Sequence, residues 1–307
     1  MLSTLDLTDV KISCKLSLAV YPKRETANDF TRREIVKKTL YVTDLDGTLM
    51  RDDKTISAET IHILNDYIGK GMLFTCATAR SVSSASRITS DIRFQLPLIV
   101  RNGTMLADIN SQKMESVIFT PEELASVRQC IAEETVPGFI TTFANGNEEK
   151  LYRKGVSNLG FDAYLANHSN DNRLRAVKTE DELYIGDVCY FTYIGERDKL
   201  EPLYERIKKC NQCAHNFQKD NYREEYWLEI FPREATKAKA IQKIMQKYQC
   251  ERLVVFGDSL NDISMFQIAD EAYAVANAEV SLKAIATGII GDNNSDSVAK
   301  WLQMYAL

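Results

Sequence analysis

A run of β-branched and aromatic residues, Thr39-Leu-Tyr-Val-Thr43, is followed at once by Asp44-Leu-Asp-Gly-Thr48. A buried strand that ends in polar residues and glycine is typical of the carboxyl edge of a parallel α/β sheet. Because strand side chains alternate, Asp44 and Asp46 start on the same side. Two neighbouring carboxylates repel each other unless a cation or a proton divides their roles. Taken alone, the motif also fits a helix cap or an Asx-turn, which Asp-Gly commonly forms.

The residues after this motif alternate between helical and strand patterns. A helix capped by Ser57 is predicted, because Ile61, Leu64 and Ile68 recur at helical spacing. The next expected elements are a strand over 72–77, a helix over 81–90 and a strand over 96–100. Together with the first strand, these segments predict a βαβαβ unit.

After Asn102-Gly103 the alternation of strand and helix patterns stops, and residues 105–232 contain both in no regular order. The expected elements there are helices over 121–135 and 199–210 and strands over 139–143, 188–194 and 225–231. We interpret this block as an inserted α+β domain. The alternating pattern then resumes with a helix over 237–247, a strand over 252–256 and shorter strands over 272–275 and 288–290.

The predicted fold class is therefore α/β, with a doubly wound, Rossmann-like core and an inserted α+β domain. The core comprises residues 39–104 and 233–307, the insertion comprises 105–232, and an N-terminal extension covers 1–38. A length of 307 residues agrees with two domains.

Composition excludes several classes of function. The chain has 38 Lys and Arg against 43 Asp and Glu, a net charge of -5, and it lacks the basic block of a general nucleic-acid binder. Its longest apolar runs are shorter than the roughly 18 residues of a membrane span, and the N-terminus lacks a signal-peptide core. Seven scattered cysteines favour a reducing compartment over a disulfide framework. We expect a cytoplasmic protein that binds neither nucleic acid nor membranes; the sequence leaves its oligomeric state open.

Further chemical groups follow other predicted strands and begin one helix. Thr78 follows the second strand, Lys237 begins the helix after the insertion, and Asp258 and Asp262 follow a later strand. In a parallel sheet these positions converge on one edge, where ligands bind. Carboxylates with room for water suit Mg²⁺, whereas a hydroxyl, an ammonium and loop N–H groups suit a phosphoryl group. This is the set of groups used for phosphoryl transfer through an aspartyl phosphate.

At this point the sequence resembles the haloacid dehalogenase (HAD) superfamily, and within it the Cof-type phosphatases with a type C2B cap. The resemblance covers about residues 38–305. It is carried by four motifs in the family's order, namely Asp44-Leu-Asp-Gly-Thr48, Thr78, Lys237 and Gly257-Asp-Ser-Leu-Asn-Asp262. It implies a Mg²⁺-dependent phosphatase acting on a small phosphorylated metabolite, a sugar phosphate or a nucleotide-like phosphate, with residues 105–232 as the cap.

The resemblance also implies a role for each matching residue. Asp44 would be the nucleophile and Asp46 the general acid and base. The expected Mg²⁺ ligands are Asp44, the backbone carbonyl of Asp46, and Asp258, with Asp262 as a second-shell or water-mediated partner. The expected phosphate-binding residues are Gly47, Thr78, Lys237 and Asn261. Arg80 and Asn102 would face the cap and contact substrate.

Two other functions remain open at this stage. A phosphomutase of the same architecture would return the phosphoryl group to product instead of to water. A non-catalytic metabolite sensor could keep the fold, although a binder needs neither a nucleophile nor a partnered acid. Ala79 and Ala238 stand where the family usually has glycine, which removes backbone freedom but no catalytic group.

One cysteine pair was considered as a possible metal site. Cys210 and Cys213 lie close to His215, but a structural zinc site needs four ligands and no second pair stands at suitable spacing. The pair falls at the end of the predicted helix over 199–210, where we expect the two thiols to share a helix face.

Overall fold

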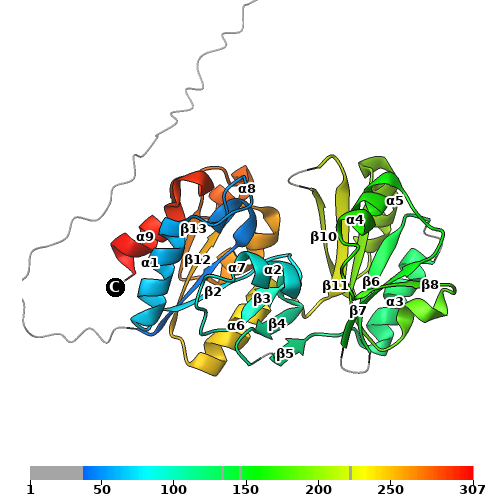
Figure 1. Ribbon diagram of the computed structural model, residues 1–307, viewed down its shortest axis with the longest axis horizontal. Helices are drawn as coiled ribbons and strands as arrows, with labels where there is room; N and C mark the ends of the chain where they lie inside the picture. Colours follow the sequence, from blue (N-terminus) through cyan, green and yellow to red (C-terminus); the bar gives the residue numbers. More distant parts are fainter. Residues whose placement is uncertain (1–36, 112, 133–134, 145–146, 221–222, 307) are drawn as a thin grey trace, which may run out of the picture. The chain divides into compact units, whose positions relative to one another are not determined.

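The computed structural model describes residues 37–306, apart from 112, 133–134, 145–146 and 221–222 (Figure 1). Nearly all of the predicted N-terminal extension, up to residue 36, therefore lies outside the described residues. No helix of the described part of the chain is long and apolar enough to cross a membrane.

Five parallel strands form the central sheet, in the order β14-β13-β12-β1-β2. The strands are β1 (Thr39–Thr43), β2 (Leu73–Cys76), β12 (Arg252–Gly257), β13 (Glu271–Ala274) and β14 (Gly288–Ile289). A parallel bridge between Ala77 and Ile99 extends the array toward β3 (Leu98–Val100). The predicted α/β fold class is confirmed.

Helices surround this sheet, and apolar side chains fill the space between them. They are α1 (Ala58–Gly69), α2 (Val82–Ile88), α6 (Lys237–Tyr248), α7 (Ile263–Ile268), α8 (Val280–Lys283) and α9 (Ser297–Tyr305). Helix α1 contacts α9, and α6 contacts α7. As predicted, Ser57 caps α1, because its hydroxyl accepts a hydrogen bond from the Thr60 N–H at 3.0 Å.

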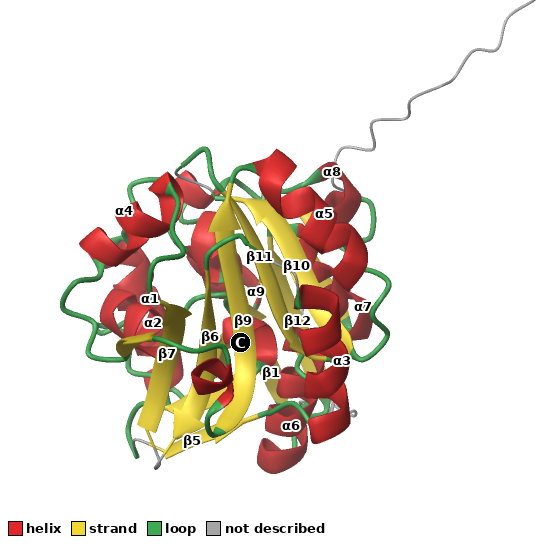
Figure 2. Cartoon of the chain, turned by 90° about the vertical axis from the view of Figure 1, so that its right-hand side faces the viewer, coloured by secondary structure: helices red, strands yellow, loops and turns green. Residues whose placement is uncertain are grey.

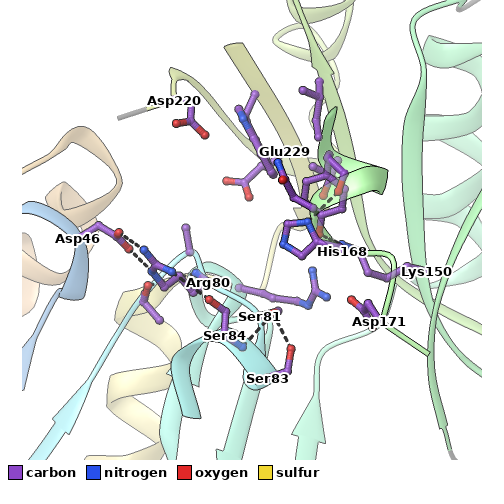
Figure 3. A pocket seen from close by; sticks show the side chains of 18 of the residues that line it. Asp46, Arg80, Ser81, Ser83, Ser84, Lys150, His168, Asp171, Asp220 and Glu229 are labelled. Carbon is purple, nitrogen blue, oxygen red and sulfur yellow. Dashed lines mark hydrogen bonds and ion pairs between the residues drawn. The ribbon is translucent and has the colours of Figure 1, made fainter. Parts of the chain in front are cut away.

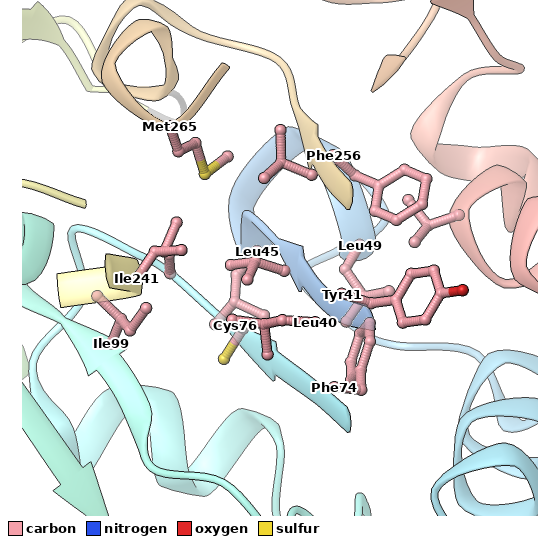
Figure 4. Packing of buried hydrophobic residues seen from close by; sticks show 14 of the residues in the cluster. Leu40, Tyr41, Leu45, Leu49, Phe74, Cys76, Ile99, Ile241, Phe256 and Met265 are labelled. Atoms are coloured by element: carbon pink, nitrogen blue, oxygen red, sulfur yellow. The ribbon is translucent and has the colours of Figure 1, made fainter. Parts of the chain in front are cut away.

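The turn that carries the aspartate motif is anchored by its own leucines. Leu45 and Leu49 belong to η1 (Leu45–Leu49), and both are buried in the main hydrophobic cluster. Figure 4 shows them packed among residues of the neighbouring strands, including Phe74 of β2 and Phe256 of β12. Alternation of buried leucines with polar residues therefore holds the polar groups at the edge of the sheet.

The first residues of the predicted insertion, from 105 to 116, form two strands that were not predicted. Strands β3, β4 (Met105–Asp108) and β5 (Lys113–Ser116) form a three-stranded antiparallel sheet. Met105, Leu106 and Ala107 are buried in the same hydrophobic cluster as β1. Thus β4 pairs with β3, β5 pairs with β4, and both precede the second large sheet in the sequence.

The second large sheet has six strands in the order β10-β11-β9-β6-β7-β8, which lie side by side in Figure 2. Its strands are β6 (Gly138–Ala144), β7 (Asn147–Arg153), β8 (Leu174–Val177), β9 (Asp187–Gly195), β10 (Cys213–Lys219) and β11 (Tyr226–Pro232). All neighbours are antiparallel except β7 and β8. In the sequence, helix α4 (Leu159–Asn167) connects these two parallel strands.

The two faces of this sheet differ in character. Helices α3 (Pro121–Ile131) and α5 (Arg197–Ile207) pack together, and α5 contacts β9, β10 and β11. Leu228 and Ile230 of β11 join their hydrophobic cluster. The alternate residues Trp227 and Glu229 line a pocket instead, because successive strand residues point to opposite faces. The face opposite α3 and α5 thus bears pocket-lining residues beside an apolar cluster that includes Phe139, Phe161 and Ile194.

The cysteine pair corrects one prediction. Helix α5 ends at Ile207, so Cys210 lies in the turn after it. Cys213 begins β10, where it pairs with Pro232. The two thiols do not share a helix face, because pairing with β11 draws the chain into a strand three residues after Cys210.

Candidate active site

Two neighbouring strands bring the acidic residues together. Asp44 follows β1 and Asp258 follows β12, and the Asp44 N–H donates to the Phe256 carbonyl at 2.9 Å. Asp262 ends the short turn η4 (Leu260–Asp262). One carboxylate oxygen from each aspartate lies within 4.8 Å of the others. The predicted convergence at the sheet edge is thus present.

Lys237 joins this group from the first position of α6. Its Nζ donates to Asp44 Oδ1 at 2.6 Å and to Asp262 Oδ1 at 2.7 Å, and the residue is 1% exposed. The start of α6 is set by a close backbone approach: a Cβ on Gly103 would lie 2.2 Å from the Thr236 carbonyl oxygen. Only glycine fits there, and its φ of +96° is also a glycine conformation.

Both carboxylate oxygens of Asp262 are engaged within the protein. While Oδ1 holds Lys237, Oδ2 accepts the N–H groups of Asp258 at 3.0 Å and Ser259 at 3.1 Å. Asp258 in turn accepts the Thr48 hydroxyl at 2.9 Å. Asp262 therefore positions the loop and the lysine, which fits its expected place outside the direct metal ligands.

Burial and mutual repulsion shape the charges of this cluster. Burial, together with the nearby carboxylates, raises the pKa of Asp44 to about 7 and that of Asp258 to about 9. Burial alone would lower the pKa of Lys237, but Asp262 and Asp44 raise it above its usual range. Among the described residues, two buried carboxyl groups, Asp44 and Asp262, and the half-buried Asp258 thus lie around the ammonium of Lys237.

A divalent cation would offset this excess of negative charge. Among the described residues, Asp44, Asp258 and Asp262 are the one group of acidic, histidine or cysteine side chains close enough to hold a metal ion. Their hard oxygen donors suit Mg²⁺. The donor set therefore fits the ion expected from the sequence.

Gly47 allows the aspartate turn to fold back against Asp258. Its φ is +73°, and an added Cβ would lie 2.5 Å from Asp258 Oδ2. The Gly47 carbonyl accepts a hydrogen bond from the Asn277 side chain at 2.8 Å, which links the turn to the segment after β13. Both conformation and space require glycine at this position.

The carboxylate of Asp46 pairs with Arg80 (Figure 3). Arg80 Nε lies 2.6 Å from Asp46 Oδ2, and Nη2 lies 2.5 Å from Oδ1. Ser84 accepts a further hydrogen bond from Arg80 at 2.9 Å, and the Thr78 hydroxyl accepts the Arg80 N–H at 3.1 Å. The expected substrate-contacting arginine thus holds the expected acid.

Asn102 takes a different place from Arg80. It is buried at a φ of +54°, and its amide donates to Tyr190 Oη at 3.0 Å and to Glu229 at 3.1 Å. Its carbonyl oxygen accepts the Asn261 amide at 3.1 Å. Arg80 and Asn261 line the pocket, whereas Asn102 does not. The structure brings Asn102 to a bracing position instead of the expected substrate contact.

A cavity of about 900 Å³ opens over these residues. Asp44, Asp46, Thr78, Arg80 and Asn261 line one part of it. Residues on or next to the six-stranded sheet line the rest, among them Lys150, Tyr164, Arg173, Trp227 and Glu229. The sequence had favoured Trp227 as a core residue, with a substrate wall as the second interpretation, and had not connected the other four residues with the site; the alternation of Trp227 and Glu229 with buried Leu228 and Ile230 was the available signal.

Comparison with known proteins identifies the family. Residues 41–302 match the family model of the haloacid dehalogenase-like hydrolases. The chain belongs to this family. The predicted family and the prediction of a hydrolytic enzyme are therefore confirmed.

Individual relatives of this hydrolase are distant but cover most of the chain. It is 22% identical over 286 residues to the 5-amino-6-(5-phospho-D-ribitylamino)uracil phosphatase YwtE of Bacillus subtilis, covering 84% of this chain and 95% of the relative. It is 25% identical over 274 residues to the HMP-PP phosphatase of Serratia proteamaculans, covering 85% and 92%.

A solved structure agrees with the fold. The HAD subclass IIB sugar phosphatase BT4131 superposes on the hydrolase with a TM-score of 0.67 at 19% identity, covering 88% of this chain and 99% of that one. At this identity the likeness shows a common fold.

Proposed function

We propose that this hydrolase is a Mg²⁺-dependent phosphatase of small phosphorylated metabolites that works through an aspartyl phosphate on Asp44. The observation that carries the proposal is the buried cluster of Asp44, Lys237 and Asp258 at the carboxyl edge of the sheet, beside a cavity large enough for a metabolite. The names of its relatives support small phosphorylated metabolites as the substrates, among them a phosphate monoester in the case of the 5-amino-6-(5-phospho-D-ribitylamino)uracil phosphatase.

The geometry supports Asp44 as the nucleophile. Lys237 holds Asp44 Oδ1, which fixes the orientation of the carboxylate. Attack of an Asp44 oxygen on phosphorus would form the acyl phosphate and release the ester oxygen as the leaving group. Water would then attack the phosphorus, release inorganic phosphate and restore the carboxylate.

Other residues would stabilise the charge of the transferring phosphoryl group. The Lys237 ammonium and the Thr78 hydroxyl lie at the edge of the sheet beside Asp44 and are assigned to the phosphoryl oxygens, with Gly47 and Asn261 of the neighbouring turns. Asp44, the Asp46 carbonyl and Asp258 would hold Mg²⁺, and Asp262 would brace this set. Bound there, Mg²⁺ would neutralise charge that develops on the phosphoryl oxygens.

Asp46 is proposed to protonate the leaving oxygen and later to deprotonate the attacking water. In the structure its carboxylate is engaged by Arg80 in two hydrogen bonds. Proton transfer from Asp46 requires that this pair open. We propose that Arg80 moves to the substrate phosphoryl group, which would free Asp46 for the leaving group.

We further propose a division into a catalytic core and a cap. The predicted boundary at residue 105 shifts to about 117 in this proposal, because β4 pairs with β3, β5 pairs with β4, and Met105, Leu106 and Ala107 belong to the hydrophobic cluster of the core. The cap would then comprise 117–232. Its pocket-lining sheet face would contact the part of the substrate beyond the phosphoryl group and so select sugar phosphates or nucleotide-like phosphates.

We propose the cytoplasm as the location. The cysteines of the described residues are all free thiols, Cys76, Cys130, Cys189, Cys210, Cys213 and Cys250. Free thiols persist in a reducing compartment.

A panel of phosphate esters assayed with Mg²⁺ tests the proposed function. We expect phosphate release from at least one metabolite ester and from p-nitrophenyl phosphate, and loss of both activities in Asp44→Asn. Mass spectrometry of the products in ¹⁸O-labelled water would show label in the released phosphate. An isomerised phosphate ester in place of free phosphate would identify a phosphomutase and overturn the proposal.

A further inference from the structure

Lys150 is a buried cation on the wall of the pocket. It lies on β7, is 5% exposed and lines the cavity that also contains Asp44. Its Nζ donates to the Tyr164 hydroxyl and lies 4.5 Å from the centre of that ring and 4.7 Å from the centre of Phe139. The Tyr164 hydroxyl is the one hydrogen-bond partner of this ammonium within the described residues, although an ammonium has three N–H groups to donate.

The carboxylates near Lys150 are already paired with arginines. Glu148 accepts from Arg101 through one oxygen and from Arg173 at 3.0 Å through the other. Both oxygens of Asp171 accept from Arg173, at 2.8 and 2.7 Å. In the part of the chain that the structure describes, no carboxylate lies within ion-pair distance of Lys150.

The cations here outnumber the carboxylates that bind them. Arg101, Arg173 and Lys150 stand against Glu148 and Asp171, which pair with the two arginines. Glu229 is a further carboxyl group near Arg101, but burial raises its pKa and so favours its neutral form. A buried cation without a counter-ion is costly. In agreement, burial and the two arginines lower the pKa of Lys150 to about 7.

We propose that Lys150 is the anchor for a second anionic group of the substrate, a carboxylate or a phosphate at the end remote from the phosphoryl group that Asp44 receives. This inference rests on the proposed phosphatase function and names its substrate class as doubly anionic phosphate monoesters. An oxyanion would supply the missing counter-ion and accept the remaining N–H groups of Lys150. Arg173 lines the same part of the pocket and adds to the positive potential.

The position of Lys150 suits this role. Figure 3 shows Asp46 and Lys150 on opposite sides of the pocket, with His168 and Asp171 near the lysine. One cavity of about 900 Å³ includes both sides. A substrate can therefore present one charged group to each.

Matched substrate pairs test the inference on the unmodified protein. The carboxylate arm compares 6-phosphogluconate with glucitol 6-phosphate, and the phosphate arm compares fructose 1,6-bisphosphate with fructose 6-phosphate. With Mg²⁺ present, we expect kcat/KM to favour the doubly anionic ester of at least one pair by about tenfold or more. The arm that shows the preference identifies the second group. Equal kcat/KM within both pairs overturns the inference.

Variants then assign the preference to Lys150. Lys150→Met should reduce the preferred pair's ratio to about one, mainly through KM, whereas Lys150→Arg should retain part of it. Lys154→Met is the matched control, since this exposed lysine follows the same strand outside the pocket, and it should keep the wild-type ratio. A wild-type ratio in Lys150→Met contradicts the assignment.

The same assays separate this inference from the function on which it rests. Hydrolysis of p-nitrophenyl phosphate without any preference within the pairs overturns the anion site alone. Failure to hydrolyse any ester, p-nitrophenyl phosphate included, overturns both. The kcat/KM ratios of the wild-type protein test the inference without any variant. The test therefore remains decisive even if Lys150→Met folds poorly.

Discussion

Arg80 binds the carboxylate of Asp46 through both oxygens, with Nε 2.6 Å from Oδ2 and Nη2 2.5 Å from Oδ1. The pair joins the second aspartate of the motif after the first strand to the loop after the second strand, 34 residues along the chain. It places the proposed acid next to a group that can bind the substrate phosphate. The proposed proton transfer therefore depends on an exchange of partners by Arg80.

Arg80→Lys keeps the charge but loses the planar, two-pronged contact. We expect kcat/KM for phosphate esters to fall by about tenfold or more, because Asp46 and the phosphoryl group are then less well positioned. Initial rates over a range of substrate concentrations measure the effect. Arg87→Lys is the control, since Arg87 lines the same pocket from α2 without pairing with Asp46. An equal loss in both variants would speak against a specific role for Arg80.

Asp46→Asn keeps the size of the side chain and removes its transferable proton. General acid catalysis typically increases the rate by about 10²- to 10⁴-fold, and its effect is largest for a basic leaving group. The first chemical step should therefore slow far more for a sugar phosphate than for p-nitrophenyl phosphate. Rapid-quench kinetics with p-nitrophenyl phosphate should show a burst and then a slow steady state, because water loses its base. Asp44→Asn should show no burst. Equal slowing of the first step for both substrates would remove Asp46 from the acid role.

Metal removal should abolish activity. We expect EDTA to stop turnover, Mg²⁺ to restore it, and Ca²⁺ to fail, because Ca²⁺ accepts a looser and larger shell of ligands. Asp258→Asn should weaken the apparent Mg²⁺ affinity by at least about tenfold. In EDTA the same variant should unfold at a higher temperature than the wild type, because it removes one of three neighbouring carboxyl groups whose mutual repulsion raises the pKa of Asp258. Full turnover in Ca²⁺ alone would contradict the assignment.

Gly47→Ala should damage the site. A methyl group at this position meets Asp258 Oδ2 at 2.5 Å and must adopt a φ of +73°. We expect a loss of about 1–3 kcal/mol in the free energy of unfolding and a clear loss of activity, measured by denaturant titration and initial rates. Gly69→Ala in α1 is the matched control: its Cβ meets nothing within 4 Å, and its stability should be unchanged or slightly higher.

Lys150 should make folding stability depend on pH. Its folded-state pKa, about 7, lies below the usual value of 10.5, so the unfolded chain binds more protons between these limits. The buried charge of Lys150 therefore lowers the free energy of unfolding by its full amount below pH 7. As the pH rises above 7, the free energy of unfolding recovers by up to about 1.4 kcal/mol per pH unit. The stability difference between Lys150→Met and the wild type should narrow from pH 7 to 9, whereas Lys154→Met should show no such trend. Denaturant titrations at several pH values measure this stability difference.

The charged or titratable groups around Lys150 are Arg101, Glu148, Tyr164, His168, Asp171 and Arg173.

The sequence was most informative where a site is built from strand ends. The strand predicted over 252–256 is observed as Arg252–Gly257, and Asp258 follows it directly. Since all strands of the central sheet run parallel, the residues after them must meet at one edge, whatever the details of packing. Asp44, Lys237, Asp258 and Asp262 could therefore be placed together from the sequence.

Edge and pocket-facing strands were harder to predict. β7, with the sequence Asn147-Glu-Glu-Lys-Leu-Tyr-Arg153, was missed because it is rich in charged residues, one of which, Lys150, lines the pocket. β10 was missed as well, and its first residue, Cys213, was expected on the face of the preceding helix, whereas it pairs with Pro232. Both assignments depend on strand pairing that local patterns do not encode.

What the sequence determined by itself, then, is the family, the α/β class and the cluster at the sheet edge, because short motifs and parallel strands suffice for these. Only the tertiary structure decided how distant charges pair. Glu148 and Asp171 bind Arg101 and Arg173, which leaves Lys150 without a carboxylate partner among the described residues. Which charges pair depends on contacts between residues up to 47 positions apart, so it is decided only when the chain has folded.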